Sequence, residues 1–104
     1  VFVLTSDAKL LCVQRASGKI RWLAQLPRFR DEEDKQGVIT WRGPVLVNNR
    51  LIAANSEGQL WSIATGDGTA SLMADIKNPI SVAPIVANNM LYVLDDSGRV
   101  TAFR

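Results

Sequence analysis

The chain has 104 residues, of which 47% are hydrophobic, and a formal net charge of +2. A chain of this length holds one small domain, and this apolar content favours an ordered core over disorder. Its basic and acidic residues are interspersed, so the charge pattern does not predict binding to nucleic acid or to an anionic membrane. The chain contains no histidine and a single cysteine, which removes the commonest general base and an internal disulfide.

Ten short strands, separated by turn residues, are predicted along the chain, and no helix is predicted. They cover Val1–Thr5, Leu10–Gln14, Ile20–Gln25, Thr40–Val47, Leu51–Asn55, Gln59–Ala64, Ala70–Asp75, Ser81–Ala87, Leu91–Asp95 and Arg99–Phe103. Several of these runs, such as Leu51–Ala54, are apolar at successive positions, which predicts sheets that are covered on both faces. The segment Arg28–Gly37 shows no strand pattern and is predicted to be a long, charged surface loop.

The turn residues predict particular backbone conformations. Asn48-Asn49 and Asn88-Asn89 each lie between apolar runs, where a two-residue hairpin needs positive φ and asparagine tolerates it. Gly58 and Gly98 fit the left-handed position of longer hairpin loops. Ala8 stands at the equivalent place in the first part of the chain, so that turn must differ or carry strain.

The sequence repeats itself. Gly43–Leu60 aligns with Ala83–Val100 without a gap at a spacing of 40 residues, and Val1–Leu10 is a third copy that lies 50 residues before Leu51–Leu60. A period near 40 with about four strands per unit indicates β-propeller blades. The predicted fold is therefore all-β, a fragment of about two and a half four-stranded antiparallel blades.

We place these blades at residues 1–26 (partial), 40–76 and 81–104 (partial) of a larger propeller, because a whole ring needs roughly four to eight blades. The third copy stops before its fourth strand. The last blade of a propeller is short in this way when the N-terminal segment of the protein supplies the missing strand. We therefore expect the chain to be the C-terminal portion of the propeller domain.

The segment Cys12–Trp22 resembles the tryptophan-docking repeat of PQQ-like (quinoprotein-type) β-propellers. In this comparison Cys12 takes the small position, Gln14 the Asp/Asn position, Ser17, Gly18 and Lys19 the turn, and Trp22 the docking aromatic. The glycine permits a tight turn, and the large ring fills the gap between adjacent blades. The second copy is degenerate, since Gly68 matches the turn glycine but Leu72 replaces the tryptophan.

Within this superfamily the chain is most similar to the C-terminal third of BamB-type outer-membrane-protein assembly lipoproteins. The similarity lies in Gly43–Leu60 and in the run from Ala83 to Arg104, and the stretch Trp22–Trp41 resembles an extended loop of some members. The resemblance implies a lipid-anchored protein on the periplasmic side of the outer membrane that binds the barrel-assembly machinery. It also implies that the protein has no catalytic residues, no metal and no bound quinone or other cofactor.

The candidate partner-binding residues lie in and beside the charged loop. They are Arg28, Phe29, Arg30, Trp41 and Arg42, because arginine and aromatic residues dominate binding energy at interfaces. The alternative is a solvated loop with Phe29 against the blade edge. The acidic run Asp31–Asp34 lacks the spacing of a calcium loop and is interpreted as solvated charge.

Four further residues have a structural interpretation beside a functional one. Trp61 could stack on a planar ligand, but packing between blades is favoured. Asp95-Asp96 are expected to be turn residues rather than a carboxylate pair. Cys12 is expected to be a small core residue, because a reactive thiol needs an electropositive, exposed site.

Two other functions stay open from the sequence. The chain could belong to a PQQ-dependent dehydrogenase whose active site lies elsewhere in the ring, or to an extracytoplasmic sensor or substrate-binding propeller. Open apolar faces and unpaired strand edges further predict that the isolated chain self-associates.

Overall fold

The computed structural model describes residues 1–31 and 36–103, without the side chains of 29–31 and 36, and these ranges contain strands and turns but no helix. Accordingly, no helix in them is long or apolar enough to cross a membrane. The strands are β1 (Phe2–Leu4), β2 (Lys9–Val13), β3 (Ile20–Gln25), β4 (Phe29–Asp31), β5 (Gln36–Val38), β6 (Trp41–Val47), β7 (Arg50–Asn55), β8 (Gln59–Ala64), β9 (Ala70–Asp75), β10 (Ile85–Ala87), β11 (Met90–Leu94) and β12 (Val100–Phe103).

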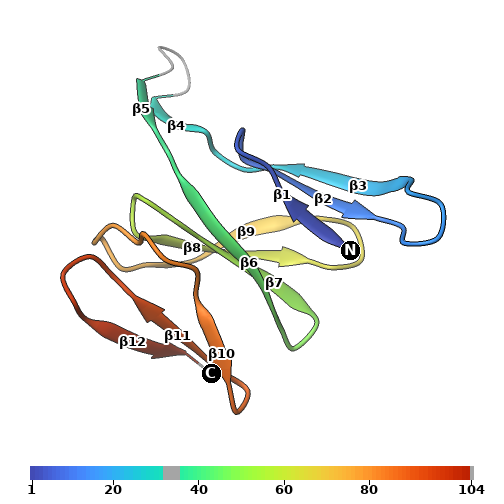
Figure 1. Ribbon diagram of the computed structural model, residues 1–104. Coiled ribbons are helices and arrows are strands. Elements are labelled where there is room, and N and C mark those ends of the chain that lie inside the picture. Colours follow the sequence, from blue (N-terminus) through green and yellow to red (C-terminus); the bar gives the residue numbers. More distant parts are fainter. Residues whose placement is uncertain (32–35, 104) are drawn as a thin grey trace.

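The strands form three up-and-down antiparallel sheets and one hairpin. We call the sheets blade 1 (β1-β2-β3), blade 2 (β6-β7-β8-β9) and blade 3 (β10-β11-β12), and in each one sequential strands are paired. The blades lie side by side like the ribs of a fan, in a slab of 42 × 41 × 18 Å (Figure 1). The predicted all-β blades and all ten predicted strands are thus confirmed, although β10 begins at Ile85 rather than at the predicted Ser81.

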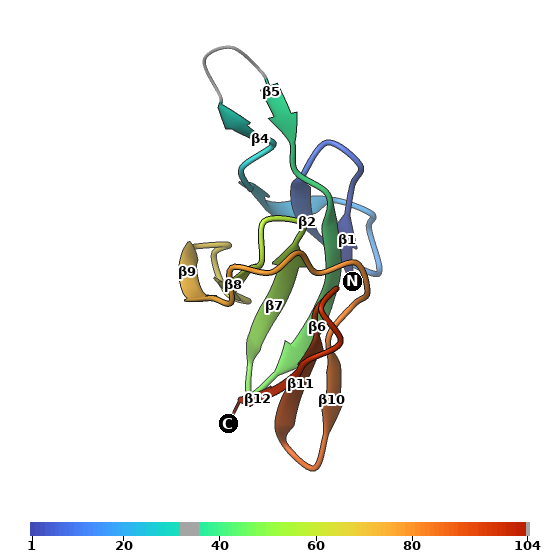
Figure 2. The ribbon, with the colours of Figure 1, turned by 90° about the vertical axis from the view of Figure 1, so that its left-hand side faces the viewer.

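The prediction for the segment Arg28–Gly37 was wrong. Instead of an unstructured loop, strands β4 and β5 pair as an antiparallel hairpin, with Phe29 opposite Val38 and Asp31 opposite Gln36. The hairpin projects beyond the three blades (Figures 1 and 2). Each of its strands has only three residues and is defined by backbone pairing. Such short strands show no alternation of apolar and polar residues from which the sequence could predict them.

The turn residues adopt the predicted backbone conformations. The φ angles are 47° and 66° at Asn48 and Asn49, and 52° and 63° at Asn88 and Asn89. Ala8 is held at a φ of 64°, which is a strained conformation for a residue with a Cβ. The first copy of the repeat therefore keeps the shape of this turn without its glycine.

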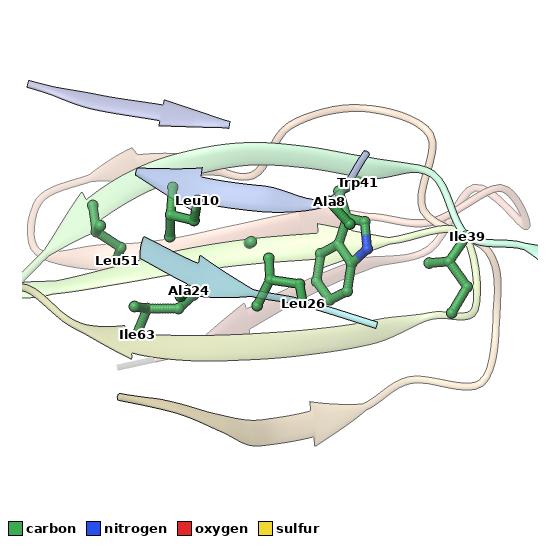
Figure 3. Packing of buried hydrophobic residues seen from close by; sticks show 9 residues of the cluster. Ala8, Leu10, Ala24, Leu26, Ile39, Trp41, Leu51 and Ile63 are labelled. Atoms are coloured by element: carbon green, nitrogen blue, oxygen red, sulfur yellow. The ribbon is translucent and has the colours of Figure 1, made fainter. Parts of the chain in front are cut away.

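Strand β7, inside blade 2, is buried on both faces because its side chains alternate between two apolar clusters. Leu51 and Ala53 pack into a cluster shared with blade 1, whereas Ile52 and Ala54 pack into a cluster shared with blade 3. None of the four is more than 2% exposed. In the first cluster, Leu10 and Ala24 of blade 1 lie across from Leu51 and Ile63 of blade 2 (Figure 3). This arrangement confirms the prediction that both faces are covered.

The segment that leaves each of the first two blades passes close to one turn of that blade, which is the β1–β2 turn in blade 1 and the β7–β8 turn in blade 2. The amide of Ile76 donates to the carbonyl of Gly58 over 2.7 Å, and Leu26 makes the equivalent bond to Ala8 over 2.8 Å. A Cβ on Gly58 would lie 2.6 Å from the carbonyl oxygen of Asn78 and 2.7 Å from its nitrogen. The close approach of two backbones therefore excludes a side chain at Gly58.

We predict that Gly58→Ala destabilises the chain more than Gly98→Ala. Both glycines have positive φ, at 82° and 89°, so each substitution costs about 1–2 kcal/mol in backbone strain. Only at Gly58 must the backbone also shift, which adds about 1–3 kcal/mol, because nothing lies within 4 Å of a Cβ on Gly98. Urea unfolding of both variants measures the difference, and equal losses would contradict the close approach.

Candidate functional site

The β1–β2, β7–β8 and β11–β12 turns of the three blades lie on one side of the slab. They cover residues 5–9, 55–59 and 95–99, and the segments that join the blades, 26–40 and 76–84, run beside them. We call this side the connection face; it is on the left in Figure 1 and toward the viewer in Figure 2. The β4–β5 hairpin begins beside this face and extends past blade 1 (Figure 2). At its base the amide of Ile39 donates to the carbonyl of Arg28.

Equivalent side chains close these turns in blades 2 and 3. The Oδ1 atom of Asn55 accepts the amides of Glu57 (3.0 Å) and Gln59 (2.9 Å). In blade 3 the Oδ1 atom of Asp95 accepts the amides of Ser97 (2.9 Å) and Arg99 (3.2 Å). An Asn or Asp side chain that accepts the backbone amides two and four residues further on closes a turn through local hydrogen bonds.

The hydroxyl of Ser97, followed by these amides, lowers the pKa of Asp95 below its ordinary value, although desolvation acts in the opposite direction. The residue is 3% exposed, and its carboxylate is bound by its own turn. Asp95 is thus a turn residue, as its position in the sequence indicated.

The segment between blades 2 and 3 is pinned to the connection face by hydrogen bonds. The amide of Asp96 donates to the carbonyl of Pro79, and the hydroxyl of Ser81 donates to the carboxylate of Asp96, each over 2.8 Å. The Nε of Arg42 donates to the carbonyl of Ser81 over 2.9 Å. Arg42 therefore presents an exposed guanidinium that is oriented by the backbone beneath it.

The predicted partner-binding residues divide between the surface and the core. Arg28 and Arg42 are exposed on the connection face. Trp41 is only 8% exposed; its indole nitrogen donates to the carbonyl of Pro27 over 2.7 Å, and its ring meets that of Trp61 edge-on at 6.3 Å. The idea that Trp41 presents its ring to a partner is thus wrong, because it is buried against a second tryptophan. The side chains of Phe29, Arg30 and the acidic run Asp31–Asp34 lie outside the described part of the chain.

Trp61 packs between blades, as favoured from the sequence. Its ring lies against the apolar cluster that blades 1 and 2 share, and its indole nitrogen donates to the Oε1 atom of Gln59 over 3.1 Å. Gln59 also accepts a hydrogen bond from the amide of the Asn55 side chain. The indole is therefore tied to the turn at the connection face through Gln59, a link that no sequence pattern had marked.

The side chain of Trp22 joins blade 1 to blade 2. Its indole nitrogen donates to the carbonyl of Thr65 over 2.9 Å, and a Cβ on Gly68 would lie 2.6 Å from its ring. The ring of Phe2 lies at 6.0 Å on the same face of blade 1. The sequence identified Gly68 only as a turn glycine, but its lack of a side chain also makes room for this ring.

The other residues of the predicted docking motif shape the turn before Trp22. Gln14 accepts the amide of Gly18 at its carbonyl and the hydroxyl of Ser17 at its side chain, and its own amide donates to the carbonyl of Lys19. Gly18 has a φ of 70°. Cys12 stands opposite Trp22 in the strand register and is buried as a free thiol. The contacts within the turn are local, and they position strand β3 with its tryptophan.

No group of three or more His, Cys, Asp or Glu among the described residues could hold a metal ion. A cavity between blades 2 and 3, lined in part by Val47, Ile52 and Phe103, has a volume of about 20 Å³, which has room for little more than one water. A planar cofactor does not fit this cavity.

Known proteins show what the chain resembles. Residues 6–104 match the family described as outer membrane protein assembly factor BamB. The crystal structure of BamB from Moraxella catarrhalis superimposes on 97% of the chain with a TM-score of 0.77 and 18% sequence identity, and the chain spans 28% of that protein's length. At this identity the match establishes the fold, which is a β-propeller fragment. No curated protein sequence matches the chain significantly.

We predict that Gly68→Ala costs less stability when Trp22 is shortened. A methyl group on Gly68 meets the indole ring in the native chain, but this ring is gone in the Trp22→Leu background. The backbone strain at Gly68 is the same in both backgrounds, so a double-mutant cycle in urea should give a coupling free energy of about 1–2 kcal/mol. Additive losses would show that Trp22 does not rest on Gly68.

We predict a weaker acid destabilisation for Asp95→Asn. The folded state holds the pKa of Asp95 below its ordinary value of 3.8, so the ionised carboxylate stabilises the fold at neutral pH, and this contribution is lost as the pH falls below 3.8 and through the lowered pKa of the folded state. The asparagine of this variant does not titrate, and its Oδ1 atom can accept the same amides, as that of Asn55 does in blade 2.

The free energy of unfolding should therefore be less pH-dependent below pH 3.8 in this variant. Part of the acid loss remains, because Asp7 and Asp67 also have lowered pKa values, held down first by Thr5 and Thr69 respectively. If the turn did not bind the Asp95 carboxylate, the free energy of unfolding would fall equally with pH below 3.8 in the native chain and in the variant.

Proposed function

Since the chain belongs to the family of the outer membrane protein assembly factor BamB, we propose that it serves as part of a non-enzymatic scaffold that binds proteins during the assembly of outer-membrane β-barrels. The observation that carries this proposal is the β4–β5 hairpin. The blade repeat is used for packing and turn closure, whereas this hairpin interrupts the repeat and extends past blade 1 at the edge of the connection face (Figure 2).

Two arginines support a protein-binding role for the connection face. Arg28 lies at the base of the hairpin, and Arg42 lies at the start of β6, where the carbonyl of Ser81 orients its guanidinium. Arginine on a rigid support loses little freedom on binding and pairs with carboxylates in a defined geometry. We propose a partner surface that presents carboxylates to Arg28 and Arg42, with Phe29 and Arg30 as further contacts on β4.

The location of the scaffold follows from the family. We propose that it acts on the periplasmic side of the outer membrane, that a lipid anchor outside this chain attaches it there, and that the barrel-assembly machinery is its partner. No cofactor is required. A PQQ-dependent dehydrogenase is not favoured, because the family model that matches the chain is described as an outer membrane protein assembly factor.

The docking motif has a structural role in this proposal. Trp22 joins β3 to the next blade, and the other residues of the motif shape the turn and strand pairing that position it. The motif consists of Cys12, Gln14, Ser17, Gly18, Lys19 and Trp22.

Binding to the periplasmic region of an outer-membrane barrel-assembly protein tests the proposal. We expect the chain to bind this region in calorimetry without any added quinone. Arg42→Glu should weaken the affinity about tenfold, which corresponds to about 1.4 kcal/mol, because it places a negative charge opposite the carboxylates of the partner.

Arg50→Glu is the matched control, because Arg50 is also exposed but lies at the opposite end of blade 2, beside the Asn48-Asn49 turn. This change should leave the affinity unchanged. Equal effects of the two substitutions would exclude the connection face, and tight binding of quinone by the protein would overturn the scaffold proposal.

A further inference from the structure

The turns at the other ends of the strands form a second face of the molecule, opposite the connection face. They cover residues 14–19, 48–49, 65–69 and 88–89, toward the right and the bottom of Figure 1. We call this surface the far face and include in it Arg50, the first residue of β7. Because blades pack through the flat sides of their sheets, turns at the strand ends stay at the surface whatever blades flank the chain.

The fold separates charges that are interspersed along the sequence. The far face carries three exposed basic residues, Arg15, Lys19 and Arg50, and one acidic residue, Asp67. Every other acidic residue whose backbone is described lies at the connection end of a blade or in the hairpin; these residues are Asp7, Asp31, Glu57, Asp75, Asp95 and Asp96. The far face therefore has an excess of positive charge, whereas acidic and basic residues are mixed on the connection face.

The three basic side chains of the far face are available to a ligand. No described carboxylate forms an ion pair with any of them, and the ion pair of Lys9 with Asp7 lies on the connection face. The carboxylate of Asp67 instead accepts the amide of Thr69, within its own turn, over 3.0 Å. The positive charge of this face is thus not neutralised by the described carboxylates.

The remaining residues of the far face favour an anionic surface as the ligand over a protein. Its turns contain no aromatic or large apolar side chain. A protein interface depends on such anchors, whereas phosphate groups need only cations and hydrogen-bond donors. Blades 1 and 2 also meet at this face, where the indole of Trp22 reaches the carbonyl of Thr65, so cations of both blades can contact one extended surface.

We propose that the far face binds an anionic phospholipid membrane through Arg15, Lys19 and Arg50. Each basic residue near such a surface strengthens binding about fivefold, so three of them give weak binding that assists a lipid anchor without replacing it. With the far face on the membrane, the connection face points away from the lipid and toward its partner. That this membrane is the outer membrane rests on the proposed function, but the affinity for anionic lipid does not.

Sedimentation with lipid vesicles tests the proposal. Vesicles of phosphatidylglycerol and phosphatidylcholine should bind the chain, and vesicles of phosphatidylcholine alone should not. Added salt should release the chain, because mobile ions screen the charges. Failure to bind the anionic vesicles, or equal binding to both kinds of vesicle, would overturn the proposal.

Two matched charge reversals locate the contact. Arg50→Glu replaces a positive charge of the far face with a negative one, so it should weaken vesicle binding about 25-fold. Arg42→Glu makes the same change of net charge on the connection face. Strand β7, with six residues, spans about 20 Å, which is twice the Debye length of about 10 Å at an ionic strength of about 0.1 M. At that ionic strength Arg42→Glu should therefore leave vesicle binding unchanged.

Equal effects of the two reversals would show that only total charge matters and would overturn the proposal. Arg15→Ala, in an exposed turn of blade 1, is an independent variant and should weaken vesicle binding about fivefold. Unchanged binding by this variant would exclude blade 1 from the contact and contradict the proposed surface.

The same reversals separate this inference from the proposed function. Arg42→Glu should weaken binding to the barrel-assembly protein but not to vesicles, and Arg50→Glu should do the reverse. Loss of partner binding alone would overturn the proposed partner and leave the membrane contact standing. Binding of soluble polyglutamate without binding of vesicles would assign the far face to an acidic protein and overturn the membrane contact.

Discussion

Packing between neighbouring sheets is the interaction on which the rest of this chain depends. Strand β7 shows it most clearly, because its successive side chains fill two different apolar clusters and are buried on both faces of the sheet. Burial of a leucine or isoleucine side chain contributes about 1.5–3 kcal/mol, so these two clusters supply much of the driving force for folding. A single blade would expose its share of these clusters, and each sheet is therefore stable only against its neighbours.

This dependence constrains where function can lie. Positions that recur in the repeats are occupied by turn closure and by packing between blades, as Asn55, Asp95 and Trp61 illustrate. The features of the connection face that depart from the repeat are the β4–β5 hairpin and the arginines beside it, and they are therefore the candidates for contact with a partner. The hydrogen bonds that pin residues 76–84 to the turns make this face a rigid support rather than a set of independent loops.

Much of the fold could be predicted because its signals are local. The Asn-Asn pairs indicate hairpins through their tolerance of positive φ, and runs of consecutive apolar residues indicate sheets covered on both sides. Hairpin β4–β5 escaped prediction because backbone pairing over three residues leaves no side-chain period.

The errors and omissions at the candidate site come from contacts between distant residues. The burial of Trp41 escaped prediction, since a tryptophan beside a charged segment resembles a surface anchor until Pro27 and Trp61 are placed around it. The contact of Trp22 with Thr65 joins residues 43 positions apart, and spacing alone does not reveal which carbonyl accepts.

The thiol of Cys12 offers the most direct test of the packing between blades. It is the only thiol in the chain, it is buried, and it stands opposite Phe2 and Trp22 on the side of blade 1 that faces blade 2. Its reaction with a thiol reagent at low protein concentration therefore measures how often the two blades separate. The account predicts slow labelling in the native chain and a marked acceleration in Trp22→Leu. Labelling of the native chain as fast as that of an unfolded thiol would show that the blades do not stay packed against each other.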